Sequence, residues 1–257
     1  MTKIISVFNQ KGGVGKTTTN INLSTYISML GYKVLVIDAD PQGNTTSGFG
    51  IEKDNLEYTL YDGIVNDVAT EQLIIPTRFN NLYLIPADSN LAGAEIEISG
   101  LGQRELKMKN VVESLTEQYH YVFIDCPPSL GLISINALVA SHSVLIPIQC
   151  EYYALEGVSQ LMNTVNLVKR SLNNRLDIQG ILLTMYDGRT NLSLQVVDEV
   201  CRYFGDKVYR TIIPRNVRLA ESPSHGLTIY EYDEKSKGAE AYLLLAKEFI
   251  EKGKQKL

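Results

Sequence analysis

The segment at 11–18, Lys-Gly-Gly-Val-Gly-Lys-Thr-Thr, constrains the fold more than any other stretch of this chain. It follows an apolar run at 4–8 that predicts a buried strand, and it precedes residues 20–30, whose apolar spacing predicts a helix. Its glycines allow the backbone to curl into a nest of N–H donors, and the positive end of the following helix adds to that nest. The segment therefore predicts a phosphate-binding loop between a strand and a helix.

Two side chains of this loop have the chemistry of a nucleoside triphosphate site. Lys16 would lie along the β- and γ-phosphates, and the hydroxyl of Thr17 would hold Mg²⁺. The general pattern has a glycine five residues before Gly15, where this chain has Gln10, and an additional lysine, Lys11, lies five residues before Lys16. The residues of the loop predicted to bind the nucleotide are Lys11, Gly12, Gly13, Val14, Gly15, Lys16, Thr17 and Thr18.

Acidic residues follow two of the other predicted strands. The strand at 33–38 ends in Asp38, with Asp40 two residues later, and the strand at 121–125 ends in Asp125. Ligands bind at the carboxyl ends of parallel strands, so Asp38 and Asp40 should face the phosphates, with Asp125 opposite the loop. Asp38 would bind Mg²⁺ through water, Asp40 would position or activate the attacking water, and Asp125 would organise Mg²⁺. A simple turn after the strand is the alternative, but it would leave two carboxylates unexplained.

Strands alternate with helices along the rest of the chain, which predicts an α/β fold with a mostly parallel, twisted sheet and helices on both faces. At 257 residues the chain is long enough for one large core, so we expect a single domain at 1–257. Further strands are expected at 82–87, 143–148 and 178–185, with a last extended segment at 208–213. Helices are expected at 59–65, 91–96, 104–119, 130–139, 154–172 and 239–252.

The composition, 44% hydrophobic and 21% charged, is that of an ordinary globular protein. No apolar run has the length of a membrane span and the chain begins with a core strand rather than a signal peptide, which predicts a cytoplasmic protein. Cys126, Cys150 and Cys201 lie in apolar surroundings and are expected to be buried thiols. The three histidines are scattered, so no structural metal is predicted.

The net charge of −5 argues against a generally basic nucleic-acid binder, but the charge is uneven. Residues 1–150 carry 9 basic and 15 acidic side chains, whereas 151–257 carry 15 and 14. This asymmetry permits a local basic face in the second half of the chain.

The loop at 11–18 resembles the deviant Walker A loop of the ParA/MinD-type ATPases, and the resemblance to the ParA/Soj branch covers essentially the whole chain. The segments that carry it include Asp-Ala-Asp-Pro-Gln-Gly-Asn at 38–44, Cys-Pro-Pro-Ser-Leu-Gly at 126–131 and Ile-Pro-Arg-Asn-Val-Arg-Leu-Ala-Glu at 213–221. The resemblance implies that Lys11 reaches across a dimer to the partner's nucleotide and that Asp40 serves hydrolysis. The implied catalytic residues are thus Lys11, Lys16 and Asp40. It also implies that Pro214 and Asn216 contact adenine, with Met185 nearby.

In the ParA family, ATP-bound dimers bind double-stranded DNA non-specifically, and a ParB-type partner stimulates hydrolysis and release. The resemblance assigns the DNA contacts to Arg189, Arg215, Arg218 and Lys247, and it implies a nucleoid-associated protein. Arginine suits phosphate because its fork donates two parallel hydrogen bonds. Any single surface arginine could instead be merely solvated, and Arg215 or Arg218 could brace the nucleotide loop. Lys252, Lys254 and Lys256 are expected to form a frayed, solvated tail.

The main alternative is a MinD-like, membrane-associated division-site ATPase. That function would need an amphipathic C-terminal helix with bulky apolar residues, and residues 251–257 are short and polar, so no stable membrane association is expected. An iron–sulfur carrier would need clustered cysteines, which this chain lacks, and a tyrosine autokinase would need a C-terminal tyrosine cluster.

Overall fold

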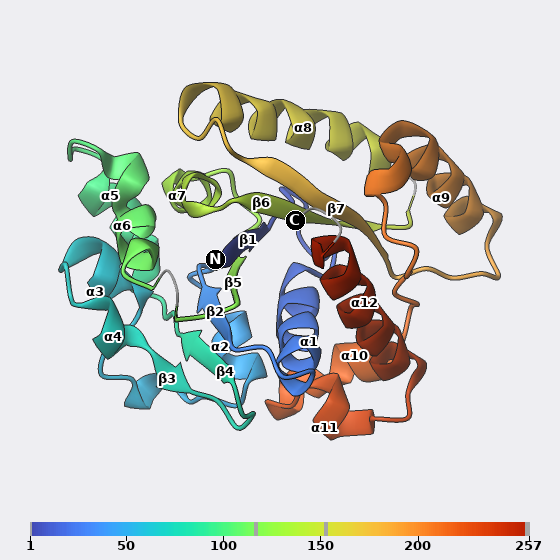
Figure 1. The fold of residues 1–257 in the computed structure, drawn as a ribbon, viewed down its shortest axis with the longest axis horizontal. Coiled ribbons are helices and arrows are strands. Elements are labelled where there is room, and N and C mark those ends of the chain that lie inside the picture. Colours follow the sequence, from blue (N-terminus) through green and yellow to red (C-terminus); the bar gives the residue numbers. More distant parts are fainter. Residues whose placement is uncertain (1, 116–117, 152–153, 255–257) are drawn as a thin grey trace.

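The strands of the protein form one sheet in the order β3-β4-β2-β5-β1-β6-β7 (Figure 1). The computed structural model describes residues 2–115, 118–151 and 154–254. Every neighbouring pair in the sheet is parallel except β3 and β4. The strands are β1 (Lys3–Val7), β2 (Val34–Asp38), β3 (Ile75–Pro76), β4 (Leu82–Ile85), β5 (Tyr121–Asp125), β6 (Ser143–Gln149) and β7 (Asp177–Thr184).

Helices cover both faces of the sheet, because successive side chains of each buried strand point to opposite sides. In β5, Val122 and Ile124 pack into one hydrophobic cluster, and Tyr121 and Phe123 into the other. The first cluster is covered by α3 (Leu60–Val65), α5 (Leu91–Ile98), α6 (Lys107–Glu113), α7 (Leu132–Ala140), α8 (Ala154–Ser171) and α9 (Asn191–Phe204). The second is covered by α1 (Lys16–Met29), α10 (Val217–Glu221), α11 (Ile229–Asp233) and α12 (Lys237–Lys254). The predicted α/β class is therefore confirmed.

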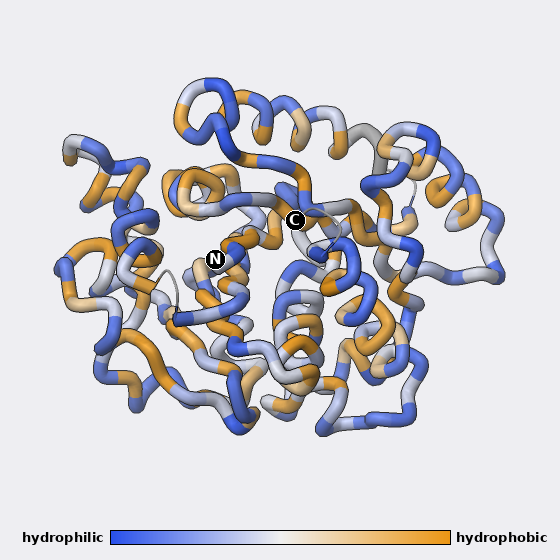
Figure 2. Tube along the Cα trace, viewed as in Figure 1, coloured by the Kyte–Doolittle hydropathy of each residue, from blue (hydrophilic) through white to orange (hydrophobic). Residues whose placement is uncertain are grey.

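Figure 2 shows the hydrophobic residues along the strands and the inner sides of the helices, with hydrophilic residues on the outer turns. Two further short helices are α2 (Asn44–Gly48) and α4 (Thr70–Leu73). Single 3-10 turns lie at Lys53–Asn55, Arg104–Leu106, Gly205–Lys207 and Ser222–His225.

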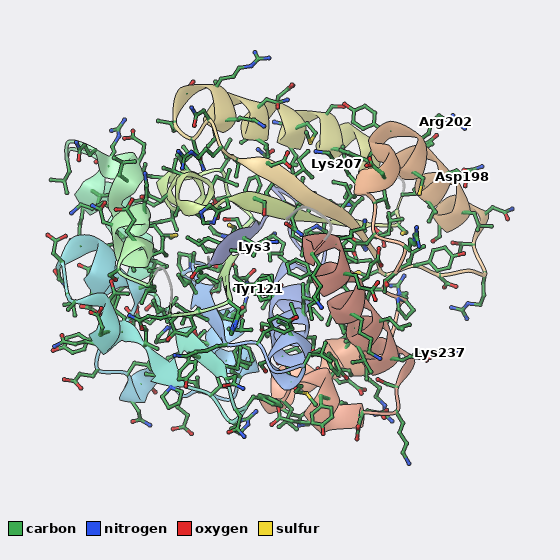
Figure 3. All side chains as sticks on the ribbon, in the orientation of Figure 1. Lys3, Tyr121, Asp198, Arg202, Lys207 and Lys237 are labelled. Atoms are coloured by element: carbon green, nitrogen blue, oxygen red, sulfur yellow. The ribbon has the colours of Figure 1, made fainter. Side chains whose placement is uncertain are left out.

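The last helix, α12, packs beside α1 and reaches the amino ends of β1 and β5. Lys3 and Tyr121, labelled in Figure 3, are paired in register at these strand ends. Lys3 Nζ donates to the carbonyl of Gly253 at 2.9 Å, and the Tyr121 ring meets Phe249 at 5.5 Å between centroids. The last turns of α12 are thereby held against β1 and β5.

Two predicted elements are wrong in extent. The helix expected at 104–119 begins as a 3-10 turn, continues as α6 and ends at Glu113, with residues 116–117 outside those described. Asn136 of α7 sets its start, since its side chain accepts from the N–H of Met108 and donates to the carbonyl of Arg104. The segment expected at 208–213 forms no strand: it meets β7 through an isolated bridge at Val208 and through backbone hydrogen bonds from Tyr209 and Ile213.

Two side-chain predictions are also wrong. Cys201 is exposed, because it lies on the outer side of α9, whereas Cys126 and Cys150 are buried as expected. Lys252 belongs to α12 and not to a frayed tail: its Nζ donates to the carbonyls of Asp206 and Val208. Lys254 is the last residue of α12, and Lys256 lies outside the described residues.

Candidate nucleotide site

A pocket of about 980 Å³ opens at the carboxyl ends of the central strands. Segments far apart in sequence line it: the loop before α1, the turns after β2, β5 and β7, the segment leading into α10, and single residues of α5 and α12. The lining residues include Gly12, Gly13, Gly15, Lys16, Thr17, Thr18, Asp40, Pro127, Pro128, Ser129, Thr184, Met185, Pro214, Arg215 and Asn216. The fold therefore brings most of the predicted nucleotide residues to one cavity.

The loop before α1 is shaped by its glycines. Gly13 and Gly15 have φ of 73° and 89°, in the left-handed region that costs glycine little, and Gly15 is the N-cap of α1. Thr184 of β7 anchors the loop to the sheet, since its Oγ1 donates to the carbonyl of Val14 at 2.9 Å. Val14 is buried and does not line the pocket, so its backbone alone could serve a ligand.

Lys16 lies in the pocket with only 7% of the residue exposed, and its Nζ donates to the carbonyl of Lys11 at 3.0 Å. Burial lowers the pKa of Lys16, while the nearby carboxylates of Asp125 and Asp40 oppose that shift. The side chain of Lys11 is exposed and is not part of the pocket wall. One lysine is thus placed for a ligand inside the pocket, and the other lies outside it.

Thr17, which lines the pocket, and Asp125, which is fully buried and does not line it, form the candidate metal end of the site. Oδ2 of Asp125 accepts from the hydroxyls of Thr17 and Thr45, each at 2.7 Å. The other oxygen, Oδ1, is buried without a hydrogen-bond partner, and burial raises the pKa of Asp125 to about 6. A buried carboxylate oxygen with a free lone pair beside a hydroxyl fits a hard cation such as Mg²⁺. Thr45, which sequence reasoning missed, holds the other oxygen in place.

Asp38 lies next to Asp125 in the strand register and, like Asp125, is fully buried and does not line the pocket. Its Oδ2 accepts from the N–H and the hydroxyl of Thr46 at 2.8 and 2.7 Å, and its Oδ1 from the N–H of Asp40 at 3.2 Å. Burial and the charge of Asp125 raise the pKa of Asp38 to about 7. Asp38 therefore does not reach the pocket wall, because α2 turns back over it, and its contact with Mg²⁺ through water stays a prediction.

Asp40 does reach the pocket, with 8% of the residue exposed. Its Oδ1 accepts from the N–H of Gln42 at 2.9 Å, and its carbonyl accepts from the N–H of Gly43 at 2.8 Å. The turn that was the alternative interpretation is therefore present, and it holds the carboxylate at the pocket wall.

The opposite end of the pocket is less polar. Met185 lines it with φ of 53°, unusual for a residue with a side chain, and Pro214 and Asn216 lie beside it. The Asn216 side chain caps α10 by accepting from the N–H of Arg218 at 2.8 Å. Leu219 and Tyr242, which sequence reasoning missed, also line the pocket.

Comparisons with known proteins show the family of this chain. A family model described as "AAA domain" matches residues 2–178. The chain is 57% identical to the "Sporulation initiation inhibitor protein Soj" of Bacillus subtilis over 253 residues, 98% of this chain and 100% of that protein. It is 50% identical to the "Chromosome partitioning protein ParA" of Myxococcus xanthus over 97% of this chain and 88% of that protein. The chain belongs to the Soj/ParA family of chromosome-partitioning ATPases.

A solved relative of this Soj/ParA chain carries a nucleotide. The structure of "Cobyrinic Acid a,c-diamide synthase" of Mycobacterium smegmatis with bound ADP and magnesium is 35% identical, with a TM-score of 0.88 over 100% of this chain and 97% of that one. The resemblance to the deviant Walker A ATPases is thereby confirmed. Within the described residues, no helix of the Soj/ParA chain is both long and apolar enough to cross a membrane.

The four residues assigned to DNA by resemblance lie on the surface of the Soj/ParA chain, but two of them have acidic partners. Arg189 is 87% exposed and forms a two-pronged ion pair with Asp187, at 2.8 and 2.7 Å. Arg189 lowers the pKa of Asp187 well below its usual range. Arg218 pairs with Glu221 at 3.1 Å and with Asp233 at 3.5 Å. Arg215 and Lys247 are exposed, and Arg215 also borders the nucleotide pocket.

Proposed function

We propose that this chain is an ATP-driven switch for DNA partitioning. ATP closes a dimer, the dimer binds double-stranded DNA non-specifically, and a ParB-type partner stimulates hydrolysis and release. The observation that carries the proposal is one pocket lined by the phosphate loop, the Asp40 carboxylate and the segment at Met185, Pro214 and Asn216, in a chain 57% identical to Soj over its length. Residues 1–257 would act as one ATPase domain.

The chain is an ATPase of its family and uses ATP with Mg²⁺. Lys16 and the loop N–H groups bind the phosphates, with Thr18 at the start of the helix. The Thr17 hydroxyl and Asp125 would hold Mg²⁺, which neutralises charge that develops on the transferred phosphoryl group. Asp38 is paired with Asp125 in the strand register and holds α2 in place through Thr46.

Hydrolysis then depends on Asp40 and on a second chain. Asp40 is held at the pocket wall by its turn, where it can orient the attacking water. The Lys11 side chain is exposed and free to reach a partner's nucleotide, while its carbonyl stays with Lys16. Because Asp40 comes from one chain and Lys11 from the other, ATP hydrolysis stays slow until the two chains form the closed dimer.

DNA binding follows from dimer formation in this proposal. Arg189, Arg215, Arg218 and Lys247 give each chain a modest set of phosphate donors, and a dimer presents two such sets to one duplex. Binding should therefore need ATP and weaken with salt. Association with the nucleoid would be a consequence of this binding.

The test is the fluorescence anisotropy of a labelled random-sequence duplex titrated with the protein in ATP, ADP or no nucleotide. Asp40→Ala would hold the ATP state, and Arg189→Glu in the same background is the matched variant. Binding confined to ATP, weakened by salt and lost in Arg189→Glu, supports the proposal. Equal binding in all three nucleotide states, or no binding by an Asp40→Ala dimer with bound ATP, would contradict it.

A further inference from the structure

The segment at 208–216 brings Pro214 and Asn216 to the pocket and runs beside β7. Between two hydrogen bonds that join it to β7, it contains more residues than β7 does. The N–H of Tyr209 donates to the carbonyl of Ile181 at 2.9 Å, and the N–H of Ile213 donates to that of Leu183, also at 2.9 Å. In a regular parallel ladder both strands advance by the same number of residues. Here the segment advances by four residues while β7 advances by two, so it carries a two-residue bulge.

The bulge is held by one side chain of α12. Oε1 of Glu248 accepts from the N–H of Arg210 at 2.8 Å. Its Oε2 accepts from the N–H and the hydroxyl of Thr211, at 2.9 and 2.8 Å. The Glu248 side chain is only 14% exposed. Its carboxylate thus takes the place of β7 as the acceptor for two consecutive backbone groups.

A second residue of α12 fixes the start of the same segment. Lys252 Nζ donates to the carbonyl of Val208 at 3.1 Å, lies 4.5 Å from the centre of the Tyr209 ring, and is 3.6 Å from Glu248 Oε1. The two side chains lie one helical turn apart on α12 and act together. We call the pair Glu248 and Lys252 the α12 clasp.

Beyond the bulge the chain passes directly into the pocket. Tyr186 donates its N–H to the carbonyl of Ile213 at 3.1 Å, and Arg215 donates to the carbonyl of Tyr186 at 2.8 Å. Ile213, Pro214 and Asn216 then line the apolar end. The length of the bulge therefore determines which residues of this segment line the pocket.

We propose that Glu248, within the α12 clasp, is a positioning residue for the nucleobase of the bound nucleotide. It holds the bulge that sets the place of Pro214 and Asn216 at the base end, and it touches no part of the phosphate site. The inference rests on the proposed nucleotide site. It adds a determinant of base affinity that lies in the last helix, far in sequence from the phosphate loop.

A carboxylate is the group that this bulge needs. Both oxygens accept, and a bond between a charged acceptor and an N–H is stronger than a neutral one. In Glu248→Gln the amide nitrogen would confront one N–H donor, so that variant keeps only part of the clasp. Glu248→Ala removes all three hydrogen bonds.

The experiment measures the dissociation constants of ATP, ADP and inorganic tripolyphosphate, each with Mg²⁺, for the full chain. Glu248→Ala should weaken ATP and ADP about tenfold. Glu248→Gln should show a smaller loss, and neither variant should change the affinity for tripolyphosphate, which uses only the phosphate loop. Glu251→Ala, an exposed carboxylate on the same helix, is the control and should match the wild type. In steady state, KM for ATP should rise while kcat stays within about twofold.

Unchanged ATP affinity in Glu248→Ala, or an equal loss for tripolyphosphate, would overturn the inference and leave the proposed function standing. A wild-type chain that binds tripolyphosphate and ATP equally would overturn the base site itself. If Glu248→Ala does not fold, Glu248→Gln and Thr211→Val give the same comparison, because each removes only part of the bonding. If both of these variants then bind ATP as tightly as the wild type does, the proposed role of Glu248 is refuted.

Discussion

Replacing Asp38 by asparagine should stabilise the protein in the absence of nucleotide and Mg²⁺. Asp38 is fully buried beside Asp125, and the two residues are paired in register. Burial raises the pKa of Asp38 from its ordinary 3.8 to about 7, and the neighbouring charge of Asp125 adds to the rise. The folded chain therefore binds a proton at Asp38 more tightly than the unfolded chain does.

The sign of the pH dependence follows from that difference. Between about pH 4 and pH 7 the folded state holds more protons than the unfolded state, so the free energy of unfolding falls as the pH rises. Each pKa unit corresponds to about 1.4 kcal/mol, and a rise from 3.8 to about 7 gives about 4 kcal/mol at higher pH.

Asparagine avoids this cost with little loss of bonding. Its oxygen can still accept from both donors of Thr46, whereas its amide nitrogen faces the N–H of Asp40, whose bond at 3.2 Å is lost at a cost of about 1–2 kcal/mol. The expected net gain for Asp38→Asn above neutral pH is therefore about 2–3 kcal/mol. Near pH 5 the gain should largely disappear.

The assay is urea unfolding with EDTA at about pH 5 and about pH 8 for the wild type and Asp38→Asn. Asp198→Asn, which changes an exposed carboxylate on α9 (Figure 3), is the control and should follow the wild type at both pH values. The reasoning is refuted if Asp38→Asn is less stable than the wild type at the higher pH, or if both lose the same stability between the two pH values.

Two other substitutions test the candidate DNA surface and the fold. Asp187→Asn frees the guanidinium of Arg189 and should tighten DNA binding by about twofold to fivefold in the ATP state, measured by anisotropy; weaker binding would show that the ion pair orients Arg189 for DNA. Gly226→Ala should cost about 2–4 kcal/mol in urea unfolding, because Gly226 has φ of 62° and a Cβ there would lie 2.8 Å from the Cα of Gly50. Gly157→Ala, with open space around it, is the control, and an equal effect of both substitutions would count against this argument.

The fold was predictable where the chemistry is local. Apolar runs ending in Asp38 and Asp125 identified buried strands, and both end at the same edge of the sheet. The helix α9 was missed although its signal is local: Thr190 caps it by accepting from the N–H of Ser193, and its apolar residues follow helical spacing.

Other features depend on residues far apart in sequence. The run at 208–213 has strand-forming residues, yet Glu248 captures its N–H groups from 37 and 38 positions away and prevents a regular ladder. The burial of Asp38 depends in the same way on α2 folding back over it. The pairing of Arg189 with Asp187, by contrast, was within reach of the sequence, because the two lie two residues apart.

The most direct test of the partitioning switch is the composition of the DNA complex, measured by sedimentation velocity. A labelled duplex of random sequence is mixed with the Asp40→Ala chain in ATP or in ADP. The switch predicts a complex with two chains for each bound duplex in ATP, and free duplex in ADP. A complex of the same composition in ADP, or one with a single chain in ATP, would contradict the coupling between nucleotide, dimer and DNA.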